Sequence, residues 1–152
     1  MKHLLLVYSS QSGHTEALAQ AVAAGAAESA DDVELRCLRA DAAGLEDLLW
    51  ANGLLIGTPE NFGYLSGLVK DFLDRTYYPA QSKVTGLPWA MFVSADNDGS
   101  GAVRALERIA LGYGWSKVAE PVISHGVPDA EALRQCRELG QAMAAGLGCG
   151  IF

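Results

Sequence analysis

The chain alternates strand-length apolar runs with segments of helical period, and this alternation is the strongest constraint on its fold. The runs 3–8, 53–57 and 89–93 are mostly apolar, as expected of strands buried on both faces. The segment 65–75 instead has apolar residues at i, i+3, i+4, i+7 and i+8, which is the spacing of one helix face. Strands that alternate with helices predict a parallel sheet covered by helices on both faces.

The remaining segments continue the pattern through one domain, residues 1–152. Apolar and charged residues alternate in 33–38, which indicates an edge strand with one solvent-exposed face. We therefore predict an α/β fold, a doubly wound five-stranded parallel sheet in the order 2-1-3-4-5. The expected strands are 3–8, 33–38, 53–57, 89–93 and 115–123. The expected helices are 13–28, 45–50, 65 to about 77, 103–113 and a last one that starts at Pro128.

Composition excludes several classes of partner. A net charge of −7 argues against nucleic acid or an anionic membrane. No apolar run approaches the roughly 20 residues that a membrane span needs. The three cysteines, Cys37, Cys136 and Cys149, have no metal-binding spacing and are odd in number. We expect free thiols, no metal site and a cytoplasmic location.

The turn after the first strand has the composition of a phosphate-binding site. It contains Ser10, Gln11, Ser12, Gly13, His14 and Thr15, and a helical pattern begins at once. The free N–H groups at a helix start, with a partial positive charge behind them, attract anions. No lysine or arginine lies between Lys2 and Arg36, so neutral donors would hold a single terminal phosphate. The simpler interpretation is an ordinary connection in which Ser12 caps the helix.

Two further polar, glycine-containing loops, 58–64 and 94–101, follow the third and fourth expected strands. In the order 2-1-3-4-5 these loops and the first turn meet at the carboxyl ends of neighbouring strands, around one crevice. Phe62 and Tyr64 are able to lie against a flat ring. Glu60 and Asn61 are able to meet the edge of a heterocycle. A planar ring that carries a phosphate on a chain is FMN.

The same motifs resemble the flavodoxin-like superfamily. Residues 7–16 resemble its phosphate loop, which has the typical motif S/T-x-x-G-N/H-T. Residues 57–75 are similar to the isoalloxazine loop and following helix of the branch of WrbA-like flavoproteins and NAD(P)H-dependent FMN reductases. That branch has the pattern P-x-x-x-G-x-x-x-G-x-x-K-x-x-x-D, which matches Pro59, Gly63, Gly67, Lys70 and Asp74.

The resemblance implies a set of FMN-binding residues in each loop. The phosphate would be held by Ser10, Gln11, Ser12, Gly13, His14 and Thr15. The ring would be flanked by Thr58, Pro59, Glu60, Asn61, Phe62 and Gly63. The pyrimidine side or the ribityl chain would be contacted by Ser94, Ala95, Asn97 and Gly99. No side chain has to act as an acid or a base, so no catalytic residue is assigned.

The resemblance implies an oxidoreductase that takes electrons from NADH or NADPH, by a ping-pong exchange, and reduces a quinone, a flavin or another small acceptor. The chain departs from WrbA-like quinone reductases, which are longer and carry an insertion that helps to build a tetramer. Electron-carrier flavodoxins usually flank the ring with a Trp and a Tyr and surround it with acids. Here the second loop offers Phe62 and Tyr64 and the third offers Asp96 and Asp98, so the pattern is mixed. An electron carrier that docks on a redox partner, and a flavin-free module of the same fold, are the alternatives. A homodimer is a family-level expectation.

Other activities on similar folds lack their residues here. A response-regulator receiver needs acids after the first strand and an aspartate after the third, where this chain has Ser9 and Thr58. The serine-hydrolase motif G-x-S-x-G is absent, and the first turn has no cysteine for a phosphatase. Residues 99–101 start like a dinucleotide fingerprint but lack its third glycine. His125 follows the last expected strand and is either a crevice residue, a partner contact or a plain loop histidine.

Overall fold

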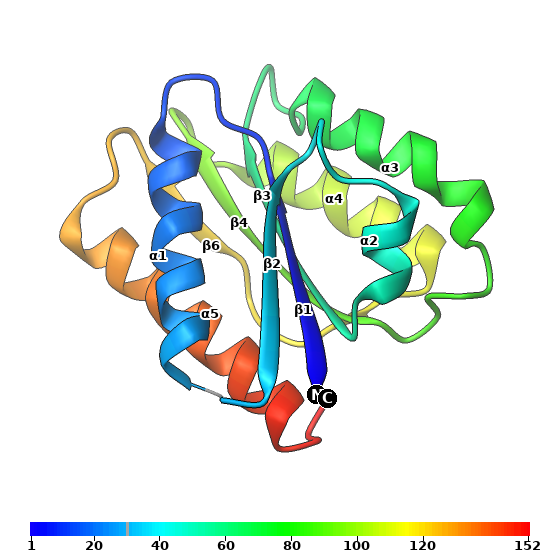
Figure 1. Cartoon of the computed structure of the whole chain (residues 1–152). Coiled ribbons are helices and arrows are strands. Elements are labelled where there is room, and N and C mark those ends of the chain that lie inside the picture. Colours follow the sequence, from blue (N-terminus) through cyan, green and yellow to red (C-terminus); the bar gives the residue numbers. More distant parts are fainter. Residues whose placement is uncertain (30) are drawn as a thin grey trace.

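The computed structural model of the chain describes residues 1–29 and 31–152. Its strands and helices alternate in the predicted order, and Figure 1 shows them as one sheet between two layers of helices. The strands are β1 (Lys2–Tyr8), β2 (Val33–Arg39), β3 (Gly53–Pro59), β4 (Pro88–Ala95), β5 (Ser116–Lys117) and β6 (Val122–His125). The helices are α1 (His14–Ser29), α2 (Leu45–Trp50), α3 (Gly67–Ala80), α4 (Ser100–Tyr113) and α5 (Ala130–Gly148).

The sheet confirms the predicted fold class and strand order. All neighbouring strands are parallel, in the order β2-β1-β3-β4-β5, with β6 also paired to β4. Helices α1 and α5 cover one face, and α2, α3 and α4 cover the other (Figure 1). The central strands β1 and β3 are buried on both sides, as their apolar runs require. Because these strands all run in the same direction, the loops after β1, β3 and β4 lie at one end of the sheet, and the order of strands along the chain reverses between β1 and β3.

The last strand differs from the prediction, because the segment 115–123 is not one continuous strand. Its first part, β5, pairs with Pro88 and Trp89, and its second part, β6, pairs with the other end of β4. Pro121 lies between the two parts and has no N–H group to donate to a sheet ladder. The fifth position of the sheet is therefore filled by two short strands.

Several helix boundaries also differ from the prediction, since α3 starts at Gly67 instead of 65 and α4 at Ser100 instead of 103. Helix α3 continues through Pro79 to Ala80, because Pro79 lies in the last turn and removes only one N–H group from the helix. Helix α5 begins at Ala130 instead of Pro128. The carboxylate of Asp129 caps it by accepting a hydrogen bond of 2.8 Å from the N–H of Ala132.

Glycines let α1 and α5 approach each other at backbone distance. A Cβ atom at Gly25 would lie 2.0 Å from the carbonyl oxygen of Arg137, and one at Gly140 would lie 2.0 Å from that of Val22. No side chain fits at either position. This contact fixes the direction of α1, whose first turn carries the expected phosphate loop.

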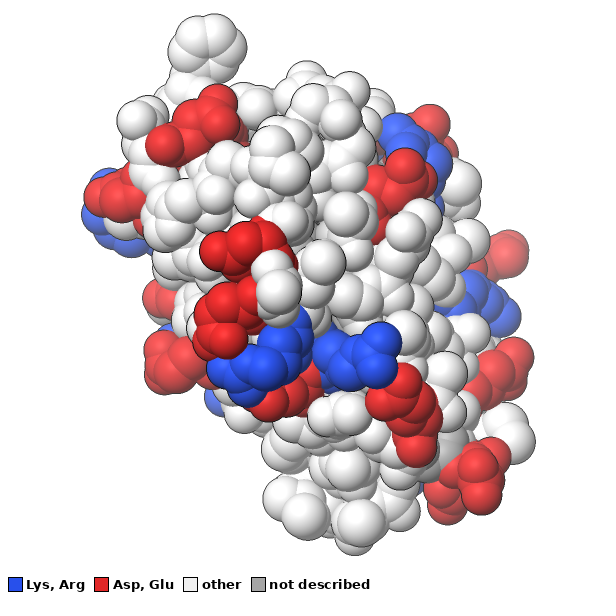
Figure 2. All heavy atoms as spheres, turned by 90° about the vertical axis from the view of Figure 1, so that its left-hand side faces the viewer, with Lys and Arg blue, Asp and Glu red and all other residues white. Residues whose placement is uncertain are grey.

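The outer face of α1 and α5 carries charges of both signs close together. Figure 2 looks onto this side of the molecule and shows basic groups bordered by acidic ones. A 3.0 Å ion pair joins Arg137 on α5 to Glu28 on α1. Within the described ranges, none of the helices is long and apolar enough to span a membrane.

Candidate functional site

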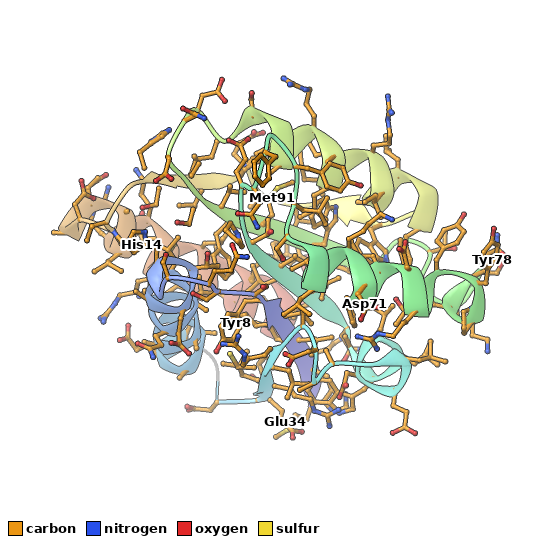
Figure 3. The ribbon with its side chains drawn as sticks, turned by 90° about the horizontal axis from the view of Figure 1, so that it is seen from above. Tyr8, His14, Glu34, Asp71, Tyr78 and Met91 are labelled. Carbon is orange, nitrogen blue, oxygen red and sulfur yellow. The ribbon has the colours of Figure 1, made fainter. Side chains whose placement is uncertain are left out.

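The three predicted loops form one crevice at the carboxyl ends of the strands. It has a volume of about 160 Å³, and every one of the three loops contributes to its lining. Figure 3 looks down on this end of the molecule, with Tyr8 and His14 near each other and Tyr78 far away on α3. The lining residues are Gln11, Ser12, His14, Thr15, Pro59, Glu60, Asn61, Ser94, Ala95 and Asp96. All of these except Asp96 are in the predicted set.

The other predicted residues lie in the same loops but do not line the crevice. Thr58 is fully buried beneath the second loop, where its Oγ1 accepts a 2.9 Å hydrogen bond from the N–H of Ser66. Asn97 and Phe62 are exposed, and the Phe62 ring projects into solvent. The remaining ones, Ser10, Gly13, Gly63 and Gly99, shape the backbone of their loops.

The first turn holds a set of N–H groups that lack protein partners. The hydroxyl oxygen of Ser10 accepts from the N–H groups of Gly13 (3.1 Å) and Glu16 (3.2 Å), so Ser10 and not Ser12 caps the helix start. Gly13 has φ of 95°, a conformation that favours glycine. Within residues 1–29 and 31–152, no acceptor is bonded to the four N–H groups of Gln11, Ser12, His14 and Thr15.

A basic group lies behind this turn that the linear sequence did not reveal. Arg39 pairs with Tyr8 in the β1–β2 register, and its Nη2 donates to the carbonyl oxygen of Ser10 at 3.4 Å. The strand register is the only signal that places it there. Next to it, burial and the hydrogen bond to Glu16 (3.2 Å) raise the pKa of Tyr8. The turn is thus supported by Arg39, while its inner surface presents neutral donors.

The second loop closes in a tight turn. Asn61 and Tyr64 exchange two backbone hydrogen bonds of 2.9 and 3.0 Å. The two residues between them, Phe62 and Gly63, both have positive φ, of 52° and 73°. Two successive positive φ angles define a type I′ turn. This geometry turns the Phe62 side chain outward and leaves Asn61 on the crevice side.

Glu60 connects the second loop to the third. Its N–H donates to the carbonyl oxygen of Ser94 at 2.8 Å. Its carboxylate accepts from the N–H groups of Gly101 (2.9 Å) and Ala102 (3.2 Å), at the start of α4. A Cβ atom at Gly101 would lie 2.1 Å from the carbonyl oxygen of Gly63, so the two loops are in backbone contact. The Glu60 side chain is therefore engaged with α4.

The third loop is ordered by its own polar residues. The carboxylate of Asp98 accepts from both the N–H (3.0 Å) and the hydroxyl (2.9 Å) of Ser100, and these bonds lower its pKa. Gly99 has φ of 77°, and a Cβ atom there would lie 2.8 Å from Cγ2 of Ile123. His125, at the end of β6, is exposed and does not line the crevice.

The donor set fits the FMN that the flavodoxin-like resemblance implies. The four unbonded N–H groups and the Ser and Thr hydroxyls of the first turn suit a single phosphate, because they are neutral donors on residues that line one crevice at a helix start. The other two loops line the rest of the crevice mostly with polar groups, and Pro59 and Ala95 add apolar surface. The first turn is thus able to bind a phosphate, and the other two loops lie beside it, where a heterocycle would contact them from the open side of the crevice.

Comparison with known proteins agrees with this geometry. The solved structure of a flavodoxin from the domain Archaea superposes with a TM-score of 0.82 at 21% identity, covering 95% of this chain and 98% of that chain. A flavodoxin, WrbA-like protein from Agrobacterium tumefaciens superposes with a TM-score of 0.77 at 23% identity, covering 95% and 96%. These two likenesses concern the fold.

The relatives found by sequence include proteins named flavodoxin and proteins named NAD(P)H dehydrogenase (quinone). A flavodoxin of Aquifex aeolicus is 29% identical over 95% of this chain and 86% of its own length. An NAD(P)H dehydrogenase (quinone) of Paracoccus denitrificans is 28% identical over 80% of this chain and 69% of its own length. The flavodoxin family profile matches residues 6–140. Because that match covers most of the chain, this protein belongs to the flavodoxin family.

Proposed function

We propose that this protein binds FMN in the crevice and uses it to pass electrons from NAD(P)H to a small acceptor such as a quinone or a free flavin. The observation that carries the proposal is the set of unbonded N–H groups at the start of α1, facing a crevice walled by two further loops. FMN, when bound, supplies hydride and electron transfer, which amino-acid side chains cannot supply themselves.

The chain's own residues would bind and orient this cofactor. The N–H groups of residues 11, 12, 14 and 15 would hold the phosphate without an ion pair. Asn61, Ser94 and Ala95 would meet the heterocycle. Glu60 would act as a positioning residue, because it holds the second loop against the start of α4.

The outer side of the crevice supports an enzyme over a carrier. No Trp, Tyr or Phe is among the residues that line it, and the Phe62 ring is fully exposed to solvent. A second planar molecule would therefore have room to approach the cofactor. The relatives named NAD(P)H dehydrogenase (quinone) support the same assignment.

An electron carrier is the second candidate. The relative from Aquifex aeolicus, which aligns over most of both chains, is a flavodoxin. Asp96 lines the crevice, and Asp98 is exposed beside it, so an acidic rim is available for a redox partner. These two observations are the reason to test the carrier directly.

The deciding experiment mixes the FMN-loaded protein with NADPH or NADH in the absence of oxygen. We expect the yellow absorbance to bleach within seconds and to return when a benzoquinone is added, with steady-state turnover in the presence of both. A flavin that stays oxidised with either nucleotide, and is bleached only after addition of a separate reductase, would reject the enzyme in favour of the carrier. A protein that retains no FMN after desalting would reject both.

A further inference from the structure

Among the residues that the structure describes, two arginines have no carboxylate partner within 4.0 Å. The chain has seven arginines, and five of them lie within 4.0 Å of an acidic side chain. The exceptions are Arg104 and Arg108, which make neither an ion pair nor a side-chain hydrogen bond to any residue that the structure describes. In a chain of net charge −7, with acids available for nearly every arginine, this pair is unusual.

Both arginines line a single groove. Its volume is about 310 Å³, and it lies between α4 and the loop after β3. We call it the arginine groove, and its lining residues are Tyr64, Arg104, Ala105, Arg108 and Ile109. Arg104 and Arg108 are four residues apart, hence on the same face of α4, and both side chains are exposed. The two arginines therefore make one rim of the groove cationic. Tyr64 adds an aromatic residue that is 41% exposed. Ala105 and Ile109 add apolar surface.

The groove adjoins the FMN crevice. Asn61 lines the crevice and Tyr64 lines the groove, and the backbones of these two residues exchange two hydrogen bonds. The first turn of α4, which precedes Arg104, is held to the same loop by Glu60 through Gly101 and Ala102. A ligand with two parts joined by a short linker is thus able to occupy both sites across one loop.

A phosphate group on an aromatic nucleoside matches this lining. Guanidinium groups bind phosphate with two parallel hydrogen bonds, and a pair of them one helical turn apart is able to share one dianion. A tyrosine face is suited to a purine ring, and an arginine is a common partner of the 2′-phosphate that distinguishes NADP from NAD. The carboxylate of Asp98, whose pKa is lowered mainly by its hydrogen bonds from Ser100 and to a smaller extent by Arg104, lies beyond ion-pair distance from that guanidinium.

We propose that the arginine groove binds the 2′-phosphorylated adenosine end of NADPH, and that this protein prefers NADPH to NADH. The inference rests on the proposed function, because it names the electron donor of the same site. Arg104 and Arg108 would contact the 2′-phosphate, and Tyr64 would lie against the adenine. The rest of the dinucleotide would pass over the loop after β3 toward the crevice.

The test is isothermal titration of the FMN-loaded protein with three probes, NADP⁺, NAD⁺ and 2′,5′-ADP. We expect NADP⁺ to bind at least tenfold more tightly than NAD⁺, and 2′,5′-ADP to bind and to compete with NADP⁺. The double variant Arg104→Ala/Arg108→Ala should lose this difference while it retains FMN and its far-UV circular dichroism. Arg134→Ala/Arg137→Ala, which also removes two exposed arginines from one helix, α5, is the control for the lost charge and should keep the wild-type affinities.

The outcomes separate this inference from the proposed function. If NADP⁺ and NAD⁺ bind equally, or the double variant keeps the preference, the inference is overturned even where NAD(P)H still bleaches the flavin. If 2′,5′-ADP binds through the two arginines but neither nucleotide bleaches the flavin, the groove is supported and the proposed oxidoreductase fails. If 2′,5′-ADP does not bind and an acidic redox protein protects α4 instead, the groove is a protein-docking surface and the inference is wrong.

Discussion

Replacing Glu60 by alanine tests whether this side chain supports the site or contacts the cofactor. Its carboxylate accepts two N–H groups at the start of α4, where Gly99 has no side chain to cap the helix. Hydrogen bonds to a charged group contribute about 1.5–3 kcal/mol, and loss of a helix cap costs about 1 kcal/mol. Because Glu60 is only half-buried, we expect Glu60→Ala to lower the free energy of unfolding by about 2 kcal/mol.

For a domain of this size, that loss corresponds to a fall in melting temperature of about 4–8 °C. Glu60→Gln keeps an acceptor but loses the charge that favours a helix N-terminus, so it should cost about 1 kcal/mol. The assay is urea unfolding of the FMN-free protein, followed by circular dichroism, and then measurement of FMN affinity. Glu120→Ala, at an 89% exposed side chain, is the control and should change the stability by less than about 0.5 kcal/mol.

The decisive comparison is between the FMN-free and FMN-loaded proteins. If Glu60→Ala leaves the FMN-free protein as stable as the wild type and weakens only FMN binding, the carboxylate contacts the cofactor, and its role as a clamp on α4 is refuted. If both forms lose about the same stability, Glu60 acts through the scaffold.

Four further changes have defined outcomes. Gly13→Asp should abolish FMN retention after desalting, since φ of 95° disfavours a side chain and the new charge repels a phosphate. Phe62→Ala should leave FMN affinity and the visible spectrum close to those of the wild type, because the Phe62 ring is fully exposed and does not line the crevice; weaker FMN binding would instead place this ring against the cofactor. Gly101→Ala should cost about 1–3 kcal/mol in urea unfolding, because its Cβ would lie 2.1 Å from the carbonyl oxygen of Gly63. Burial raises the pKa of Tyr113 from 10.0 to about 12, so the folded state holds this proton more tightly and stability falls as pH rises above 10. Between pH 8 and pH 11 the wild type should therefore lose about 1 kcal/mol more than Tyr113→Phe.

The fold was predictable because strands that are buried on both faces leave an unmistakable apolar run. The apolar runs 3–8, 53–57 and 89–93 identify β1, β3 and β4. The order of these strands in the sheet then brings three loops together. The last strand was the element that the sequence predicted least well, because its pairing with β4 is split around Pro121 and each half is short. Short edge strands carry too few residues for a period to be visible.

The site was predictable as a set of loops but not as a set of contacts. Gln11, His14 and Asn61 line the crevice as expected, because they follow strand ends. Arg39 was missed, because only the β1–β2 register brings it behind Ser10. The direction of the Glu60 side chain also depends on α4, which lies forty residues further along the chain. Homodimerisation, a cytoplasmic location and the individual FMN contacts stay predictions.

The backbone contact between α1 and α5 has a consequence for the order of events during synthesis. Helix α5 begins about 100 residues after the end of α1, which corresponds to roughly 5–20 s of translation. During that time the Gly25 surface of α1 has no partner, and β1 lacks the cover of α5 on the same face of the sheet. The predicted phosphate loop at the start of α1 is thus synthesised early, but α5, which packs against α1 and fixes its direction, is synthesised late. A ribosome-bound intermediate should expose apolar surface to chaperones until α5 has emerged from the exit tunnel.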